Sequence, residues 1–442
     1  MSTLKLPGHL KSILSHPSTL EEQHMNHFLG NNGSLHIKPT SEQEIAAVLK
    51  YATEHGKKVV IEGNGTKKGF GGLIDTADLL LSLTEYSGIV EHTVGDMTVT
   101  VKAGTPFGEL QTYLKTHNQQ VSLDPSLGDY ATIGGVIAAN ESGPKRLSYG
   151  SARDAVIGMR VVYSDGTILR SGGKVVKNVA GYDMNKLFIG SMGTLGVISE
   201  ITLKLRPLPK YQSIVFISFS TGNIEEIHAF VSKVLDSMIE PVALELLNPS
   251  LAEDVIGQHL FTLVISFEDV ESSVHYQENY IKSIQPSDTI LKVLHEKEAE
   301  VFWRFFSNNI SPNGACCSSE EETEAALKIG VPNMNVLDVI NKSTALKTSR
   351  PMLIKAHGGV GHGLCSVYIK GSEDAILSVI TSFTETAKTY GGYVVVNHLP
   401  FILRQKVNVW GEEPSHFPLL AGIKAKMDAK NVLNYKRFIG GI

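Results

Sequence analysis

The sequence predicts an α+β fold with more than one domain, and three observations carry this prediction. The chain has 442 residues, more than one typical domain holds. Stretches with helical spacing alternate with short β-branched runs along most of its length. Between Asp124 and Pro207, glycines recur between apolar strands, which suits loops that bring bare backbone against a large flat ligand. Ordinary turns between short strands are the alternative explanation of these glycines.

The N-terminal part predicts a strand-helix-strand unit. Residues 1–33 are polar and lack periodicity, so we expect an irregular lead-in. A short strand at 35–39 is followed by Ser41 as the N-cap of a helix, with Glu44 reaching back to the Ser41 amide. A buried strand at 57–61 completes the unit.

A glycine-rich loop at 62–72 follows this strand. Such a loop can direct successive backbone N–H groups at phosphate oxygens. It lacks the Gly-Lys-Ser/Thr ending of a Walker A loop and the GxGxxG spacing of a dinucleotide fold. Taken alone, a structural turn explains it equally well.

The next segments predict a mainly β region. Thr105 is the expected N-cap of a helix that runs to about Thr116, with Pro106 in its first turn. Asp165-Gly166 is typical of a hairpin turn. Strands are expected at 78–83, 98–103 and 200–205.

Leu208-Pro209 indicates a boundary, after which strands alternate with helices. This order predicts an α+β layer. The strands are expected at 213–219, 242–247, 260–267, 354–357 and 365–369, and the helices at 224–238, 273–284, 296–306 and 375–390. Residues 307–323 are polar and broken by proline and glycine, which favours a loop.

Composition excludes several classes of partner. The net charge is −5 and no long basic run occurs, which argues against nucleic acid and anionic membranes. No signal peptide is expected, and no stretch reaches the roughly 18 apolar residues of a membrane helix. Cys316, Cys317 and Cys365 form no CxxC pattern, which argues against a disulfide framework or a zinc site. We expect a cytoplasmic protein that reaches a membrane only through partners.

Four motifs, in this order, resemble the FAD-binding domain of the vanillyl-alcohol oxidase / p-cresol methylhydroxylase family. They are ATIGG at 131–135, YGSARD at 149–154, KNVAGYD at 177–183 and GTLGVISE at 193–200. More narrowly, the stretch resembles the smaller FAD-binding subunit of bacterial glycolate oxidase. Several motifs in order are more specific than one glycine box.

The resemblance implies a two-lobed FAD-binding domain at 34–208, an α+β cap at 209–400 and a segment at 401–442 that returns to the FAD domain. It also makes 62–72 the pyrophosphate loop. No histidine occurs in that loop, so non-covalent FAD is expected. The implied FAD-binding residues are Glu62, Gly63, Asn64, Gly65, Thr66, Pro125, Thr132, Gly134, Gly135, Asn140, Gly143, Gly150, Asp154, Gly196, Val197 and Ile198.

The resemblance further implies oxidation of a 2-hydroxy acid, which requires a base for the hydroxyl proton and a cation for the carboxylate. In the larger glycolate oxidase subunit, histidines in a His-x6-His pattern bind a divalent metal. Here His357 matches the first position, Leu364 stands at the second, and His362 is out of register. We therefore predict no metal and favour a hydrogen-bonded histidine pair.

The candidate catalytic residues are His398, Tyr182 and Arg146. His398 is a candidate base, and packing beside Pro400 is its alternative role. Lys177 and Asn178 lie in the same glycine-rich region as Tyr182 and Arg146. For these four residues, contact with the flavin edge or substrate and solvation in a surface loop remain open alternatives.

The leading hypothesis is an FAD-binding subunit of a glycolate oxidase-type complex that oxidises glycolate or D-lactate. Its implied partners are a larger FAD- and metal-containing subunit and an iron–sulfur subunit, since this chain has no cysteine cluster for iron–sulfur. The alternatives are a self-sufficient FAD oxidase or dehydrogenase of another hydroxy acid or alcohol, and a flavin-bearing scaffold without catalysis of its own.

Overall fold

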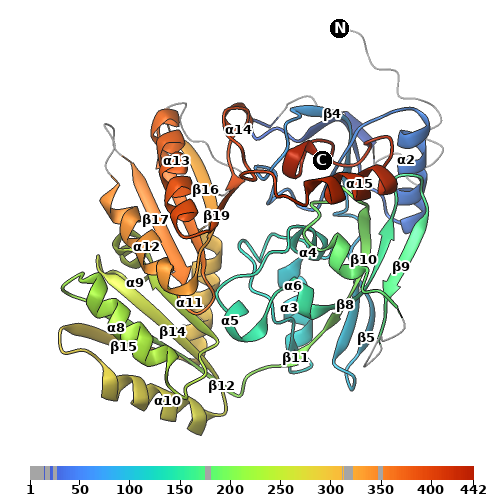
Figure 1. Ribbon diagram of the computed structural model, residues 1–442. Helices are drawn as coiled ribbons and strands as arrows, with labels where there is room; N and C mark the ends of the chain where they lie inside the picture. The colour runs from blue at the N-terminus through green and yellow to red at the C-terminus, as the bar shows by residue number, and fades with distance from the viewer. Residues whose placement is uncertain are drawn as a thin grey trace. The chain divides into compact units, whose positions relative to one another are not determined.

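The computed structural model describes residues 14, 20–22, 27–174, 181–310, 312, 322–346 and 352–442. In these ranges no helix is long and apolar enough to cross a membrane. Most of the predicted lead-in and four named residues lie outside them, namely Lys177, Asn178, Cys316 and Cys317. The predicted α+β class is confirmed (Figure 1).

Two compact units make up the chain. Unit 1 holds the N-terminal part up to Glu141, together with Ser151–Arg206 and Pro400–Ile442. Unit 2 holds Ser142–Gly150 and Pro207–Leu399. The C-terminal 43 residues thus return to the unit in which the chain begins.

Unit 1 contains two main sheets. The first has the order β1-β2-β4-β3, with β2, β4 and β3 parallel, and its strands are β1 (Leu20–Glu22), β2 (Asn32–Ile37), β4 (Thr76–Ser82) and β3 (Val59–Glu62). The second is antiparallel with the order β5-β6-β10-β8-β9, and its strands are β5 (Ile89–Thr93), β6 (Thr98–Lys102), β10 (Val197–Lys204), β8 (Val156–Val162) and β9 (Ile168–Gly172). A short pair joins β7 (Gln119–Gln120) to β11 (Arg206–Pro207).

Helix α2 (Glu42–Glu54) forms for the reasons that the sequence indicates, with one correction at its start. The hydroxyl of Ser41 accepts a hydrogen bond from the Glu44 amide, which is the expected N-cap. The Glu44 carboxylate, however, accepts from the amide of Thr40 at 2.7 Å, one residue before the predicted partner. The apolar residues at helical spacing, Ile45, Val48, Leu49 and Ala52, are all fully buried.

Helix α3 (Phe107–Lys115) begins later than predicted. Pro106 is its N-cap and makes no side-chain capping bond. The hydroxyl of Thr105 instead donates to the Lys102 carbonyl at 2.7 Å and accepts from the Gly88 amide at 2.9 Å. A predicted helix cap therefore serves to fasten the turn after β6, because the hydroxyl finds nearer backbone partners there.

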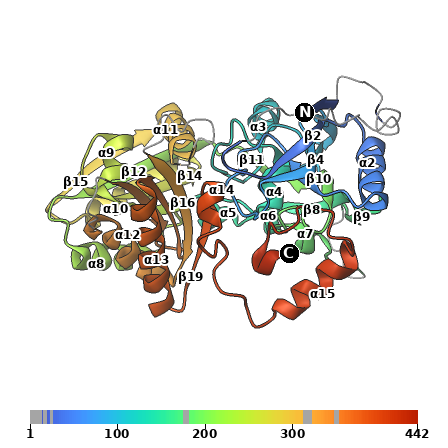
Figure 2. The same cartoon turned by 90° about the horizontal axis from the view of Figure 1, so that it is seen from above.

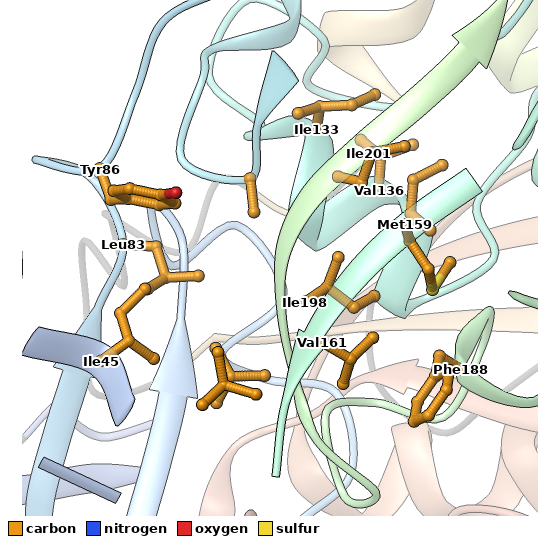
Figure 3. Packing of buried hydrophobic residues seen from close by; sticks show 14 of the residues in the cluster. Ile45, Leu83, Tyr86, Ile133, Val136, Met159, Val161, Phe188, Ile198 and Ile201 are labelled. Atoms are coloured by element: carbon orange, nitrogen blue, oxygen red, sulfur yellow. The ribbon is translucent and has the colours of Figure 1, made fainter. Parts of the chain in front are cut away.

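The core of unit 1 lies between its sheets and helices. Side chains from β8, β10 and α4 (Ile133–Ala138) meet in it, as Figure 3 shows for Met159, Ile201 and Val136. None of these three is more than 3% exposed. Each such aliphatic side chain contributes roughly 1.5–3 kcal/mol by leaving water, so this core fixes where the ends of β10 and α4 lie.

Unit 2 is built on one eight-stranded sheet with the order β15-β12-β14-β13-β17-β18-β16-β19. Its strands are β12 (Tyr211–Phe219), β13 (Ala243–Leu247), β14 (Phe261–Asp269), β15 (Thr289–His295), β16 (Thr323–Gly330), β17 (Leu353–Gly359), β18 (Leu364–Gly371) and β19 (Tyr393–His398). Its longer helices are α8 (Ile224–Leu235), α9 (Pro249–Ile256), α10 (Glu271–Ile284), α11 (Glu296–Asn309), α12 (Val336–Ala345) and α13 (Glu373–Thr389).

Helices cover both faces of this sheet. Phe219 of β12 contacts Phe230 of α8 on one face, while Phe216 of β12 contacts Phe302 of α11 on the other. Figure 2 shows α9 and α11 on one side and α8, α12 and α13 on the opposite side. The sequence did not predict β15, β16, β19, α9 or α12, since short mixed segments carry weak periodicity.

The remaining short helices are α5 (Arg146–Tyr149), α6 (Ala152–Ala155), α7 (Asn185–Phe188) and α14 (Phe401–Arg404), with 3-10 turns η2 (Asn333–Asn335) and η3 (Ile439–Gly441). Helix α15 (Phe417–Met427) belongs to the closing segment. Lys424 of this helix is buried, and its Nζ donates to the Asp428 carboxylate at 2.7 Å and to the Thr194 carbonyl at 2.8 Å. These bonds tie the end of the chain to the loop before β10.

Candidate FAD site

An open pocket lies in unit 1 where β3, α4 and the start of β10 meet. It holds about 770 Å³ of empty space, a value that includes space open to solvent. Its lining includes the predicted residues Glu62, Gly63, Asn64, Gly65, Thr66, Thr132, Gly134, Gly135, Gly196, Val197 and Ile198. It also includes Asn31, Ile61, Lys67, Lys68, Leu83, Ala103, Ala138, Ala139, Met192, Gly193, Asn434 and Arg437.

The loop after β3 passes close to the start of α4, and at the point of contact, Gly63, there is no room for a side chain. A Cβ on Gly63 would lie 2.0 Å from Oγ1 of Thr132, and the Thr132 hydroxyl itself caps α4 by accepting from the Gly135 amide. Gly65 has a φ of 72°, the left-handed region that favours glycine. The absence of a side chain at Gly63 therefore lets the loop backbone lie directly against the start of α4.

Helix α4 packs as tightly on its other side. A Cβ on Gly134 would lie 2.7 Å from the Cβ of Ala103, at the end of β6. Ala138 and Ala139 continue the pocket wall with small side chains. The small residues therefore permit tight packing at Gly134 and leave space in the pocket.

Arg437 gives the pocket wall a positive charge, and a second buried arginine, Arg404, is not among the lining residues. Arg437 lines the pocket, is 6% exposed and donates to the carbonyls of Ile61 and Lys67. Burial lowers the pKa of Arg437 to about 10, and burial and the charge of Arg437 lower the pKa of Arg404 to about 9. Both groups still carry their charge at neutral pH, so a negatively charged ligand in this pocket would be stabilised.

The closing segment supplies another pocket residue, Asn434. Its Oδ1 accepts from the Ile61 amide at 2.8 Å, and its Nδ2 donates to the Met192 carbonyl at 2.6 Å. The predicted return of residues 401–442 was the only sequence signal that could have pointed to Asn434 or Arg437. The lysines of the loop form ion pairs, Lys67 with Glu141 and Lys68 with Glu62.

Five predicted FAD residues are not among those that line this pocket, namely Pro125, Asn140, Gly143, Gly150 and Asp154. The Asp154 carboxylate accepts from the amide and hydroxyl of Ser151 and completes the capping box of α6. Gly143 and Gly150 belong to unit 2. Asn140 has a left-handed φ of 47° just after α4. Their predicted contact with FAD stays a prediction.

None of the three candidate catalytic residues is among the residues that line this pocket. The side chain of Tyr182 is 92% exposed. Arg146 donates to the Ser142 hydroxyl within unit 2. His398 ends β19 in the same unit and is 7% exposed, a burial that agrees with the packing role considered for it. Their catalytic roles remain predictions.

A buried carboxylate that the sequence analysis missed lies between His357 and His362. Oε2 of Glu245, on β13, lies 2.7 Å from Nδ1 of His357, and Oε1 lies 3.3 Å from Nε2 of His362. Burial alone would raise the pKa of Glu245, but hydrogen bonds and charge from the two histidines outweigh it, so the pKa is lowered. The expected histidine pair is thus bridged by Glu245, and Nε2 of His357 has no partner among the described residues.

Comparison with known proteins identifies the cofactor of the chain. Residues 34–172 match a family described as FAD binding domain. The chain carries an FAD-binding domain. It is an FAD-dependent oxidoreductase, and the prediction of FAD as its cofactor is confirmed. The match spans the loop after β3 and all of α4, the two elements that meet at Gly63 and Thr132.

Three curated relatives cover different shares of the chain. Glycolate oxidase subunit GlcD of Bacillus subtilis (strain 168) is 28% identical over 90% of this chain and 87% of that protein. D-lactate dehydrogenase of Archaeoglobus fulgidus is 27% identical over 90% of this chain and 89% of that protein. Glycolate oxidase subunit GlcE of Escherichia coli (strain K12) is 37% identical, over 38% of this chain and 48% of that protein.

Solved structures support the fold. A 4-ethylphenol oxidase from Gulosibacter chungangensis has a TM-score of 0.77 at 13% identity, covering 97% of this chain and 95% of that one. A p-cresol methylhydroxylase has a TM-score of 0.75 at the same identity and coverage. The predicted resemblance to flavoproteins of this type and to glycolate oxidase is therefore confirmed.

Proposed function

We propose that this flavoprotein oxidises a small 2-hydroxy acid, such as glycolate or D-lactate, as a subunit of a glycolate oxidase-type complex. The observation that carries the proposal is the extent of the match to GlcD and to a D-lactate dehydrogenase, which covers 90% of this chain and nearly 90% of both relatives. A match that continues through unit 2 supports a shared substrate class as well as a shared cofactor.

The chain's own residues fit a non-covalently held FAD. The backbone at Gly63–Thr66 and the tight contact at Gly134 would hold the diphosphate and the ring, while Arg437 would offset the diphosphate charge. Asn434 would keep the loop after β3 in place through Ile61. When bound, FAD supplies the two-electron acceptor that oxidation of an alcohol requires.

The subunit role rests on the two glycolate oxidase relatives. Both GlcD and GlcE are similar to this chain, the first over most of its length and the second over 38% of it at higher identity. We propose that the chain takes the FAD-binding subunit position and relies on a larger FAD- and metal-containing subunit and an iron–sulfur subunit. Any contact with a membrane would then come through those partners.

A second candidate function is a self-sufficient hydroxy-acid dehydrogenase, and the His357–Glu245–His362 cluster favours it. The cluster offers a buried carboxylate and a ring nitrogen without a partner among the described residues. Such groups can bind a substrate carboxylic acid or take up a hydroxyl proton. A flavin-bearing scaffold would use neither property.

Anaerobic titration of the purified full chain distinguishes these possibilities. We expect about one FAD per chain, and no loss of flavin absorbance when glycolate, D-lactate or L-lactate is added to the chain alone. Adding the partner subunits should then permit bleaching by glycolate or D-lactate.

Other results of this titration would support a different function or contradict the assigned cofactor. Bleaching of the isolated chain by D-lactate, lost in Glu245→Gln, would establish the self-sufficient enzyme. Full turnover of the complex after the chain's FAD pocket is disabled by Gly63→Ala would establish the scaffold. A chain that binds no FAD at all would contradict the assigned cofactor.

A further inference from the structure

A cluster of two histidines and one glutamate lies in unit 2, and no role described above uses it. His275 and Glu278 are one turn apart on α10, and His295 is the last residue of β15. Each residue offers one potential metal-ligand atom, and these three atoms lie within 4.8 Å of one another. Among the described residues, this group of histidine and acidic side chains meets that criterion. All residues that line the FAD pocket belong to unit 1, so the cluster is in a separate part of the chain.

The distances within the cluster suit a metal ion. Oε1 of Glu278 lies 3.0 Å from Nε2 of His295, and Oε2 of Glu278 lies 3.4 Å from Nδ1 of His275. Zn²⁺ binds nitrogen and oxygen ligands at about 2.0–2.2 Å in tetrahedral geometry, which places neighbouring ligand atoms about 3.3 Å apart. Both Glu278–histidine distances are therefore close to the ligand spacing around one ion, and the ligand atoms of all three residues lie within 4.8 Å of one another.

The surroundings resemble the supporting groups of a metal site. The Glu278 side chain is only 3% exposed, and its two carboxylate oxygens face His275 and His295. Nε2 of His275, the ring nitrogen not facing Glu278, lies 3.7 Å from a Glu271 carboxylate oxygen. Metal-binding histidines commonly direct their second nitrogen to a carboxylate in this way.

The local charge also favours a cation. Two carboxylates lie beside the His275 ring, since its Nδ1 is 3.4 Å from Glu278 and its Nε2 is 3.7 Å from Glu271. One competitor is present, since Nζ of Lys282 lies 3.9 Å from Glu278. The Lys282 side chain is 44% exposed, so it can leave the carboxylate when a doubly charged ion arrives.

We propose that His275, Glu278 and His295 bind a divalent cation of the zinc class. Two imidazoles and one carboxylate are a donor set that Zn²⁺ accepts, whereas Mg²⁺ and Ca²⁺ prefer oxygen ligands. The histidine side chains are 45% and 41% exposed, which leaves room for water at the fourth position. A bound ion clamps α10 to the end of β15 and so stabilises this corner of unit 2.

Equilibrium dialysis of the full FAD-bound chain against Zn²⁺, with the metal counted by atomic absorption, tests the proposal. We expect close to one Zn²⁺ per chain and no comparable binding of Mg²⁺. His275→Ala and His295→Ala should each weaken Zn²⁺ binding by at least about 100-fold, and Glu271→Gln by about tenfold, since losing a supporting group costs roughly 10–100-fold. Zn²⁺ should raise the unfolding midpoint of the wild type, and EDTA should reverse this.

Two matched controls make the test specific. His259 pairs with Glu253 at 2.8 Å on the surface without a third ligand, so His259→Ala should leave Zn²⁺ binding unchanged. His362→Ala tests the other histidine cluster. His295→Gln retains a side chain that can hydrogen-bond to Glu278, and an unchanged midpoint without Zn²⁺ shows that this variant is folded. Absence of Zn²⁺ binding, or binding lost only in His362→Ala, would overturn the proposal and leave the three residues as an ion-pair cluster.

Discussion

The side chain of Asn434 hydrogen-bonds to the backbone of Ile61, although most of the chain separates the two residues. Oδ1 of Asn434 accepts from the Ile61 amide at 2.8 Å, and Nδ2 donates to the Met192 carbonyl at 2.6 Å. One side chain thus fixes β3, which leads into the loop of the FAD pocket, and the turn that precedes β10. Asn434 is 2% exposed, and its bond to the Met192 carbonyl is fully buried.

Asn434→Ala should lower the free energy of unfolding by about 2–4 kcal/mol, because two buried backbone groups lose their partner. FAD affinity should fall with it, since the loop after β3 loses an anchor. Chemical denaturation and FAD titration of the apoprotein measure the two effects. The matched control is Asn408→Ala, the same change at an exposed asparagine. Wild-type stability in Asn434→Ala would show that the contact is dispensable.

Gly63→Ala should weaken FAD binding strongly. The added Cβ would lie 2.0 Å from the Thr132 hydroxyl, so the loop or the start of α4 must move away from the pocket. Overpacking of this kind costs about 1–3 kcal/mol, and the displaced backbone is the part proposed to face the diphosphate. The measurement is FAD retained after gel filtration.

Gly95→Ala is the matched control for Gly63→Ala. Gly95 lies in an exposed turn, and a Cβ there would meet nothing within 4 Å. This variant should retain wild-type FAD content and stability. If both glycine variants retained FAD equally, the close approach of the loop to α4 would not be part of the binding site.

Lys424 and Asp428 should behave as one unit in a double-mutant cycle. Asp428 is fully buried and also accepts from the amides of Val432 and Leu433. Lys424→Met leaves this carboxylate without its counter-ion and should cost about 3–5 kcal/mol. The double variant with Asp428→Asn should cost less than the sum of the two single changes. Additive free energies from urea unfolding would contradict the coupling.

Glu245 should contribute to acid sensitivity. Its pKa is below the usual value of 4.5, because the two histidines outweigh burial. An unfolded chain binds this proton more readily, so the stabilisation is present above pH 4.5 and is lost as pH falls through the lower, folded-state pKa. We expect Glu245→Gln to be less stable than wild type at pH 7, with a smaller loss of stability between pH 5 and 3.

The comparison variant for this pH profile is Glu253→Gln. Glu253 also contacts a histidine, His259, but its side chain is 62% exposed. Solvent screens such a pair, so the pH profile of this variant should follow the wild type. Parallel profiles for Glu245→Gln and wild type would show that Glu245 does not titrate differently in the folded protein.

Local patterns in the sequence were sufficient for much of unit 1. The spacing of Ile45, Val48 and Leu49 predicted α2 because one buried face repeats every three or four residues. The turn at Asp165-Gly166 was predictable because glycine readily adopts a positive φ, and Gly166 has a φ of 86°. The family resemblance carried by the motifs implied sixteen FAD-binding residues, and eleven of them line the pocket.

Side-chain partners depended on tertiary structure. Thr105 has the residue type and position of a helix cap, yet its hydroxyl bonds to Lys102 and Gly88. The sequence shows which groups can bond but not which partner is nearest once strands are paired. The sequence did not predict a role for Glu245 for the same reason. His357 and His362 lie beside Glu245 only because β13 pairs with β17.

The sequence by itself determined the α+β class and the glycine-rich loop, because these follow from short-range periodicity and steric freedom, while its motifs implied the FAD-binding architecture through their resemblance to a known family. Only the tertiary structure decided that Asn434 and Arg437 line the pocket, that Glu245 bridges two histidines, and that His295 meets α10. These contacts join segments far apart in the chain, and their geometry is set by the packing of whole sheets and helices.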